Sequence, residues 1–226
     1  MTEKTYVSES WATLWEALAD AQPNEIAVVL GDDEILWKDL DDRAARLASV
    51  FANHGITHGS RVAQLLFNDA AYLESVYACF KLRATPVNVN YRYLRNEIAY
   101  ILNNSESEVL LYHASLADRV EDIVDLVPSL KHLICVNDIG SAFATPEGQS
   151  DYAAAVSSAV PAPRIQRSGD DILFLYTGGT TGMPKGVMWR HVDLFGALAS
   201  SGYQALGLPM PANEAEVGAT ARLLNE

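Results

Sequence analysis

The stretch ILFLYTGGTTGMPKGVMW, residues 172–189, reads as two apolar strands joined by a glycine-rich loop. Its first five residues form an apolar run of the length typical of a buried strand. The loop from Thr177 to Gly186 follows directly, and Val187 to Trp189 form a second apolar segment. His191 and a predicted helix through Ala199 come next. The sequence therefore predicts a strand–loop–strand unit that leads into a helix.

The composition of this loop suits the binding of a phosphate group. Glycine occupies three of its first six positions, so several backbone N–H groups can turn toward one point without interference from Cβ atoms. Such a concavity binds anions, most often phosphate oxygens. Three threonine hydroxyls can donate further hydrogen bonds, and one lysine adds a positive charge. The candidate phosphate-binding residues are Thr177, Gly178, Gly179, Thr180, Thr181, Gly182 and Lys185.

Two widespread phosphate-binding patterns do not fit this loop. The Walker pattern needs glycine immediately before the lysine and serine or threonine after it, whereas Pro184 and Gly186 flank Lys185. The dinucleotide-binding fingerprint needs a glycine at the position of Thr177. Both patterns also precede a helix rather than a strand. A plain glycine-rich turn, with its lysine in solvent, remains the alternative that composition allows.

Upstream of the loop, apolar strands alternate with amphipathic helices. Strands separated by helices imply a mostly parallel sheet with helices on its faces, so the predicted fold class is α/β. Ser115, with Asp118 three residues later, is expected to form a capping box at the start of the last of these helices. The predicted strands are 26–30, 35–37, 61–67, 86–89, 108–112 and 132–136, and the predicted helices are 11–18, 40–51, 73–80, 94–102 and 115–127.

The chain divides into three segments by composition. Residues 1–136 carry the alternating strands and helices and are expected to form an α/β lobe. Residues 137–169 are rich in Gly, Ser, Ala and Pro, which indicates a surface connection with one short helix near 152–157. Residues 170–226 contain the strands of the phosphate loop and the following helix.

Composition and charge exclude several classes of partner. The chain has 226 residues and a formal net charge of -13, which would repel nucleic acids and anionic membrane surfaces. It has no apolar run of membrane-spanning length and no apolar signal segment at its start, so a cytoplasmic protein is predicted. Cys79 and Cys135 lie far apart without a CxxC spacing, which is typical of free thiols in a reducing compartment.

Histidines offer no convincing catalytic or metal site. His54 and His58 are four residues apart, but Gly55 and Gly59 would break a helix that aligned them. His191 is better explained as a structural anchor at a helix start than as a base. No G-x-S-x-G elbow of a hydrolase is present.

The segment YTGGTTGMPKGV, residues 176–187, resembles the AMP-binding signature of the adenylate-forming superfamily, which includes acyl-CoA synthetases, luciferases and peptide-synthetase adenylation domains. His191 stands where that family usually has a histidine. Weaker similarity extends over nearly the whole chain, and PVNVNYR (86–92) and MWRH (188–191) are most similar to fatty-acyl or steroid-side-chain CoA ligases. Gly178 departs from the family, which commonly has serine there, so one hydroxyl donor is lost.

The resemblance implies the N-terminal part of an ATP-dependent acyl-CoA synthetase. Such an enzyme activates a carboxylic acid, here a fatty or steroid-side-chain acid, as acyl-AMP and transfers it to CoA. The implied small molecules are the acid, ATP, Mg²⁺ and CoA, with Thr177 as a Mg²⁺ contact. The resemblance is also compatible with a homodimer.

The resemblance places the other catalytic groups of the family beyond residue 226. These are the adenine-binding segment, a metal-binding glutamate, a ribose-binding aspartate and a mobile C-terminal domain with an essential lysine. We therefore expect no catalytic residue and no C-terminal domain within these 226 residues, and no adenylation by this chain alone. Two alternatives stay open: an adenylation domain that loads a carrier protein, and a non-catalytic remnant that binds nucleotide.

Overall fold

A computed structural model describes residues 10–138, 144–178 and 182–225. Its helices and strands are α1 (Trp11–Ala21), β1 (Ile26–Leu30), β2 (Asp33–Leu36), α2 (Trp37–Asn53), β3 (Arg61–Leu65), α3 (Ala70–Lys81), β4 (Thr85–Asn88), α4 (Arg95–Ser105), β5 (Val109–His113), α5 (Ala117–Glu121), β6 (His132–Val136), β7 (Ser150–Asp151), α6 (Tyr152–Ser158), β8 (Ile172–Thr177), β9 (Lys185–Arg190), α7 (His191–Ala205) and α8 (Glu214–Asn225). Two 3₁₀ turns, η1 (Ala114–Leu116) and η2 (Val124–Leu126), flank α5.

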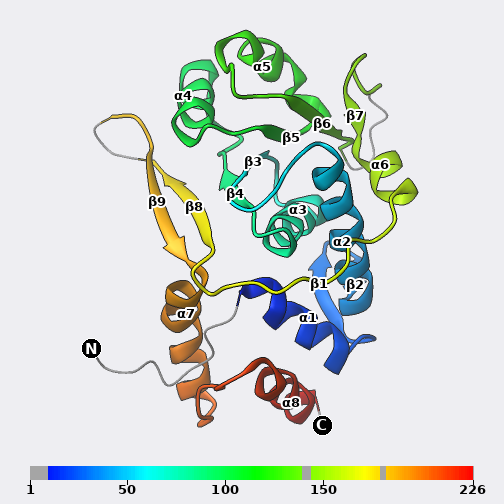
Figure 1. Cartoon of the computed structure of the whole chain (residues 1–226), viewed down its shortest axis with the longest axis vertical. Coiled ribbons are helices and arrows are strands. Elements are labelled where there is room, and N and C mark those ends of the chain that lie inside the picture. The colour runs from blue at the N-terminus through cyan, green and yellow to red at the C-terminus, as the bar shows by residue number, and fades with distance from the viewer. Residues whose placement is uncertain (1–9, 139–143, 179–181, 226) are drawn as a thin grey trace.

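A seven-stranded sheet with the order β7-β6-β5-β3-β4-β8-β9 runs through the molecule (Figure 1). Its neighbouring strands are parallel except for the antiparallel pair β8 and β9. The hairpin of β1 and β2 forms a separate two-stranded sheet. The predicted α/β fold, a mostly parallel sheet with flanking helices, is confirmed.

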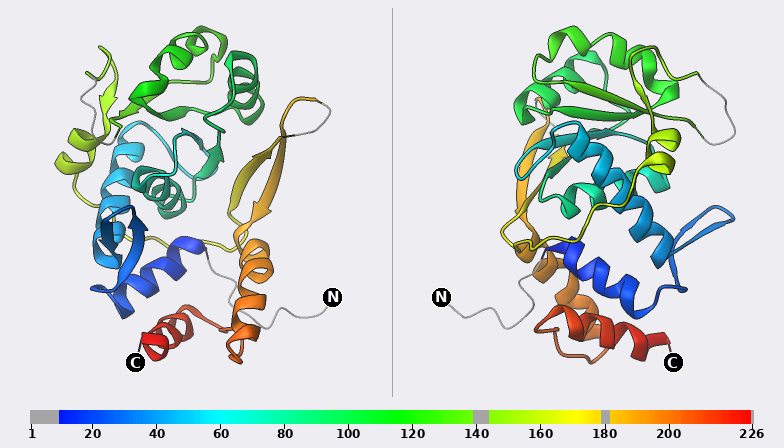
Figure 2. Two further views of the ribbon diagram at one scale, coloured as in Figure 1. Left: turned by 180° about the vertical axis from the view of Figure 1, so that it is seen from behind. Right: turned by 45° about the vertical axis from the view of Figure 1, so that its right-hand side comes forward.

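Helices cover both faces of the sheet because successive strand side chains point to opposite sides. Val62 of β3 packs in a buried cluster with residues of α2, α3 and α6. Its neighbour Ala63 belongs to a second cluster, formed with α4 and α5. Figure 2 shows the helices around the sheet from behind and in a view turned by 45°. Strands covered on both faces tend to be apolar throughout, and β5 and β6 read as nearly continuous apolar runs in the sequence.

The prediction of a single helix over residues 115–127 is wrong. Two 3₁₀ turns and the five-residue helix α5 replace it. Ser115 donates its backbone N–H and its hydroxyl to the carboxylate of Asp138, at 2.9 and 2.7 Å, instead of forming a capping box with Asp118. A tertiary contact with the chain after β6 therefore decides how this segment begins.

The connecting segment contains the expected short helix, α6, and also the two-residue strand β7, which was not predicted. After α6 the chain runs across the helices toward β8 as an extended strap, residues 159–171. Arg164 and Arg167 fasten this strap to α1 through Asp20 and Glu16. The division into three segments stays a prediction, although the strap delivers β8 to the same sheet that holds β3 to β7.

Two composition-based expectations can be compared with the described residues. Cys79 and Cys135 are both free and buried, as expected. No helix in the described ranges has the length and hydropathy needed to cross a membrane.

The helix α8 was not predicted from the sequence. Its Val217 packs with Leu14 of α1 and Phe195 of α7.

Candidate phosphate-binding site

The predicted strand–loop–strand unit is an antiparallel hairpin. β8 and β9 pair in register from Ile172 opposite Arg190 to Thr177 opposite Lys185. The glycine-rich loop therefore starts and ends at adjacent backbone positions, at the end of the hairpin farthest from α7 (Figure 1). Three of the predicted site residues, Gly179, Thr180 and Thr181, lie outside the described residues.

The structure brings a hydroxyl and a cation together at the mouth of this loop. Thr177, Gly178, Gly182 and Lys185 are all exposed to solvent. Within the described ranges no carboxylate lies within ion-pair distance of Lys185. An exposed ammonium without an acidic partner is available to an anionic ligand.

Gly186 lies against an aromatic ring, whereas Gly178 has room for a side chain. A Cβ atom added at Gly186 would approach Cζ of Tyr176 to 2.9 Å, because these two residues are register partners. A Cβ atom at Gly178 would meet only the hydroxyl of Tyr93, at the ordinary contact distance of 3.5 Å. The serine that is common at this position in the adenylate-forming superfamily would therefore fit.

We expect Gly186→Ala to lower the free energy of unfolding by about 1–3 kcal/mol, because the buried ring of Tyr176 must shift to make room for the added methyl group. Gly178→Ala is the matched control and should change stability by less than about 0.5 kcal/mol. Urea denaturation followed by tryptophan fluorescence measures both values. Equal stabilities of the two variants would contradict the close approach of Gly186 to Tyr176.

His191 begins α7 and is fully buried. Its Nδ1 accepts a hydrogen bond from the backbone N–H of Trp11 at 3.1 Å, and its carbonyl oxygen accepts one from Nε1 of the same tryptophan at 3.1 Å. Burial lowers the pKa of the imidazole to about 4, against the attraction of Asp171. The ring is therefore neutral at pH 7 and ties α7 to α1, which agrees with the predicted structural role.

A polar cavity of about 460 Å³ between α1, α2 and the strap also contains cations, but it is a poor phosphate site. Its buried Lys81 donates to Glu16 and Asp41 at 2.8 and 2.7 Å. Its Arg164 donates to both carboxylate oxygens of Asp20. Because these cations are already paired with carboxylates, a polyphosphate would meet strong repulsion there.

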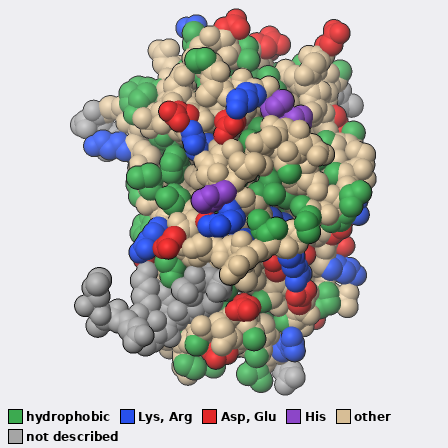
Figure 3. Space-filling view, in the orientation of Figure 1, with side chains coloured by type: hydrophobic (Ala, Val, Ile, Leu, Met, Phe, Trp, Pro, Cys, Tyr) green, Lys and Arg blue, Asp and Glu red, His purple; other side chains and the backbone are tan. Residues whose placement is uncertain are grey.

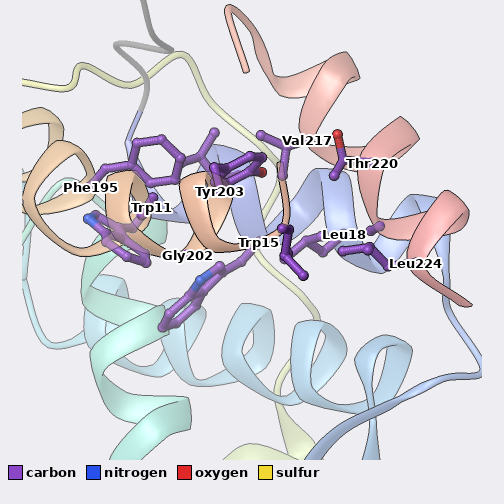
Figure 4. A pocket seen from close by; sticks show the side chains of 13 residues that line it. Trp11, Trp15, Leu18, Phe195, Gly202, Tyr203, Val217, Thr220 and Leu224 are labelled. Atoms are coloured by element: carbon purple, nitrogen blue, oxygen red, sulfur yellow. The ribbon is translucent and has the colours of Figure 1, made fainter. Parts of the chain in front are cut away.

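Two further cavities are apolar. One, of about 310 Å³, lies between α1, α7 and α8, and its walls include Trp11, Phe195, Tyr203 and Val217 (Figure 4). The other, of about 520 Å³, lies between β8, α3, α7 and α1. Among the described residues no charged side chain lines either cavity, so nothing there would neutralise a triphosphate.

Metal-binding residues do not gather in the described part of the chain, where no group of three or more His, Cys, Asp and Glu side chains could hold an ion. The rings of His54 and His132 lie 4.1 Å apart, and His58 lies near Asp171 instead of His54. On the face shown in Figure 3, acidic and basic side chains are interspersed without an extended positive patch. A phosphate site on this face would therefore depend on local groups.

Sequence reasoning missed three residues beside the loop. Asn88 of β4 bonds to the backbone of Tyr176, Asn104 of α4 accepts from the hydroxyl of Tyr176, and Tyr93 lies next to Gly178. The only signal in the sequence was Asn88, the first of the two asparagines in the PVNVNYR segment. No pattern in that segment would reveal its role.

Comparisons with known proteins identify the family of this chain. The model of the AMP-binding enzyme family matches residues 15–217. A 3-oxocholest-4-en-26-oate–CoA ligase from Rhodococcus rhodochrous is 37% identical over 83% of this chain and 34% of its own length. A long-chain-fatty-acid–CoA ligase from Thermus thermophilus is 32% identical over 80% of this chain and 33% of its own length. The chain thus spans about a third of the length of these relatives.

Solved structures show the same fold. An anthranilate CoA ligase, AuaEII, in complex with anthranoyl-AMP superposes with a TM-score of 0.76 at 24% identity, over 87% of this chain and 37% of that one. A fatty acyl CoA synthetase from Mycobacterium tuberculosis gives a TM-score of 0.67 at 26% identity, over 80% and 34% of the two chains. The family match covers the hairpin, its loop and the sheet that holds them, and this chain belongs to the AMP-binding enzyme family.

Proposed function

We propose that the loop between β8 and β9 binds the polyphosphate of ATP in an acyl-CoA synthetase. The observation that carries the proposal is the exposed Lys185, which has no acidic partner among the described residues and lies opposite Thr177 at the mouth of a glycine-rich loop. The proposed contacts are the backbone N–H groups, the threonine hydroxyls and the lysine ammonium of Thr177, Gly178, Gly179, Thr180, Thr181, Gly182 and Lys185.

In the proposed reaction a carboxylate oxygen attacks the α-phosphorus of ATP, and the bond to pyrophosphate breaks. The sulfur of CoA then attacks the acyl carbon, and AMP leaves. In this scheme the loop orients the leaving pyrophosphate and offsets its negative charge, which is positioning combined with electrostatic stabilisation. Mg²⁺ would supply further charge neutralisation, and the hydroxyl of Thr177 is its candidate contact in this part of the chain.

The names of the relatives support the choice of substrate. Acids with long aliphatic chains and steroid acids are the substrates named for them, so we propose a fatty or steroid-side-chain acid for the enzyme that contains this chain. CoA as the acceptor follows from the same names. The cytoplasmic location and the homodimer remain predictions.

We expect Lys185→Ala to weaken binding of ATP and of inorganic tripolyphosphate to this chain about 10- to 100-fold, because a hydrogen bond to a charged group contributes about 1.5–3 kcal/mol. Isothermal titration calorimetry measures both affinities. Lys38→Ala is the matched control, because Lys38 is also exposed and its ammonium donates to the neutral side chain of Asn24. The proposal fails if Lys185→Ala binds like the unmodified chain.

The catalytic part of the proposal needs a protein in which this chain is joined to the remaining two thirds of a ligase. ATP–pyrophosphate exchange should then depend on an added fatty or steroid acid, and Lys185→Ala should raise the KM for ATP. Transfer of the acyl group to a carrier protein but never to CoA would contradict the proposed acceptor.

A further inference from the structure

The strand β8 pairs with the parallel part of the sheet over a very short length. β4 and β8 share a single register pair, Val87 with Phe174. β4 ends one residue later, at Asn88, while β8 continues to Thr177, where the loop begins. The last residues of β8 therefore extend beyond the parallel ladder, and β9 is their only strand neighbour in the described sheet.

The side chain of Asn88 replaces the missing ladder at this point. Its Oδ1 accepts a hydrogen bond from the backbone N–H of Tyr176 at 2.7 Å, and its Nδ2 lies 3.5 Å from the carbonyl oxygen of the same residue. An asparagine amide carries the same donor and acceptor pair as a peptide group, so it can bind both backbone groups of one residue. Tyr176 directly precedes Thr177, the first residue of the loop.

The ring of Tyr176 is fixed separately. Its hydroxyl donates to Oδ1 of Asn104 on α4 at 2.6 Å, and its side chain is only 6% exposed. The absence of a Cβ atom at Gly186 leaves the space that the ring occupies. Tyr176 is thus held at its backbone from β4 and at its far end from α4.

We infer that Asn88 and Asn104 are positioning residues that act through Tyr176 on the phosphate loop. A donor contributes fully to phosphate binding when it lies within about 0.3 Å of its ideal distance to a phosphate oxygen. The residue from which the loop starts must therefore be held in place. Releasing Tyr176 would let Thr177 and the following N–H groups move relative to Lys185. This inference rests on the proposed binding of polyphosphate by the loop.

The test compares the affinity of variants of this chain for inorganic tripolyphosphate, measured by calorimetry at a temperature where circular dichroism shows each variant folded. We expect Asn88→Ala to weaken binding about five- to tenfold and Tyr176→Phe about two- to fivefold, as for the loss of one or two neutral hydrogen bonds. Asn103→Ala is the control for Asn88, because its amide donates to two backbone carbonyls away from Tyr176. Tyr112→Phe, which loses a bond to Gln149, is the control for Tyr176.

A second readout follows the backbone without any ligand. Hydrogen exchange at the amide of Tyr176 should accelerate in Asn88→Ala and stay unchanged in Asn103→Ala, because only Asn88 accepts from that N–H. Unchanged exchange in Asn88→Ala would overturn the inference, as would affinities that fall equally in the variants and their controls. If the unmodified chain fails to bind tripolyphosphate, or Lys185→Ala binds it equally well, the proposed function fails instead, and the exchange rates alone decide whether Asn88 holds Tyr176.

Discussion

Glu16→Gln is expected to lower the free energy of unfolding by about 3–5 kcal/mol, because it removes the negative charge from a buried ion pair and leaves the positive charges buried. Glu16 is 5% exposed and accepts from Lys81 at 2.8 Å and from Arg167 at 2.8 and 3.0 Å. Both cations are themselves buried. The neutral amide would carry no charge to balance Arg167, whose other hydrogen bond within the described residues goes to the carbonyl oxygen of Lys81, so a buried charge would lose its compensation.

Asp20→Asn provides the matched control for this variant. Asp20 lies one turn further along α1, and its carboxylate accepts from Arg164 of the same strap at 2.6 and 2.8 Å. Its side chain is 61% exposed, so the pair is screened by solvent and should contribute less than about 1 kcal/mol. Urea unfolding of both variants, followed by tryptophan fluorescence, measures the difference. Similar losses for the two variants would show that burial does not govern the energy of this cluster.

Acidification is expected to destabilise the fold through His191. Burial lowers the pKa of this imidazole to about 4 in the folded chain. In the unfolded chain the same group is protonated below about pH 6.5, whereas in the folded chain it stays neutral down to about pH 4. The contribution of this group to stability is therefore complete above about pH 6.5 and is lost as the pH falls toward 4, by about 3 kcal/mol in total. Protonation at Nδ1 would also remove the acceptor for the N–H of Trp11.

His191→Asn tests this prediction, because the amide oxygen can still accept from Trp11 but does not titrate. The free energy of unfolding, measured between pH 7 and pH 5, should fall less steeply with acid in this variant than in the unmodified chain. His58→Asn removes a histidine that is 67% exposed and is the control for losing a histidine as such. Identical slopes for the unmodified chain and His191→Asn would show that another group causes the acid sensitivity.

Local patterns in the sequence determined much of this architecture. The apolar run 172–176 and the glycines after it specify a strand and a turn through neighbouring residues alone, and the structure shows the hairpin they predict. The same holds for β1 and β6, whose bounds equal the predicted ranges. Lys185 was identified from its type and its place in the loop, but its role as a phosphate contact remains a prediction.

Only the tertiary structure decided which distant residues meet. Glu16 and Arg167 are 151 positions apart, and Asn88 and Tyr176 are 88 apart, so no local pattern could pair them. The prediction of one helix over residues 115–127 was wrong for the same reason, because the distant Asp138 accepts hydrogen bonds from the backbone N–H and the hydroxyl of Ser115. The periodicity of apolar residues indicates which face of a helix or strand is buried. Which residues pack against that face depends on the strand order and on long connections, and these form only when the whole chain packs.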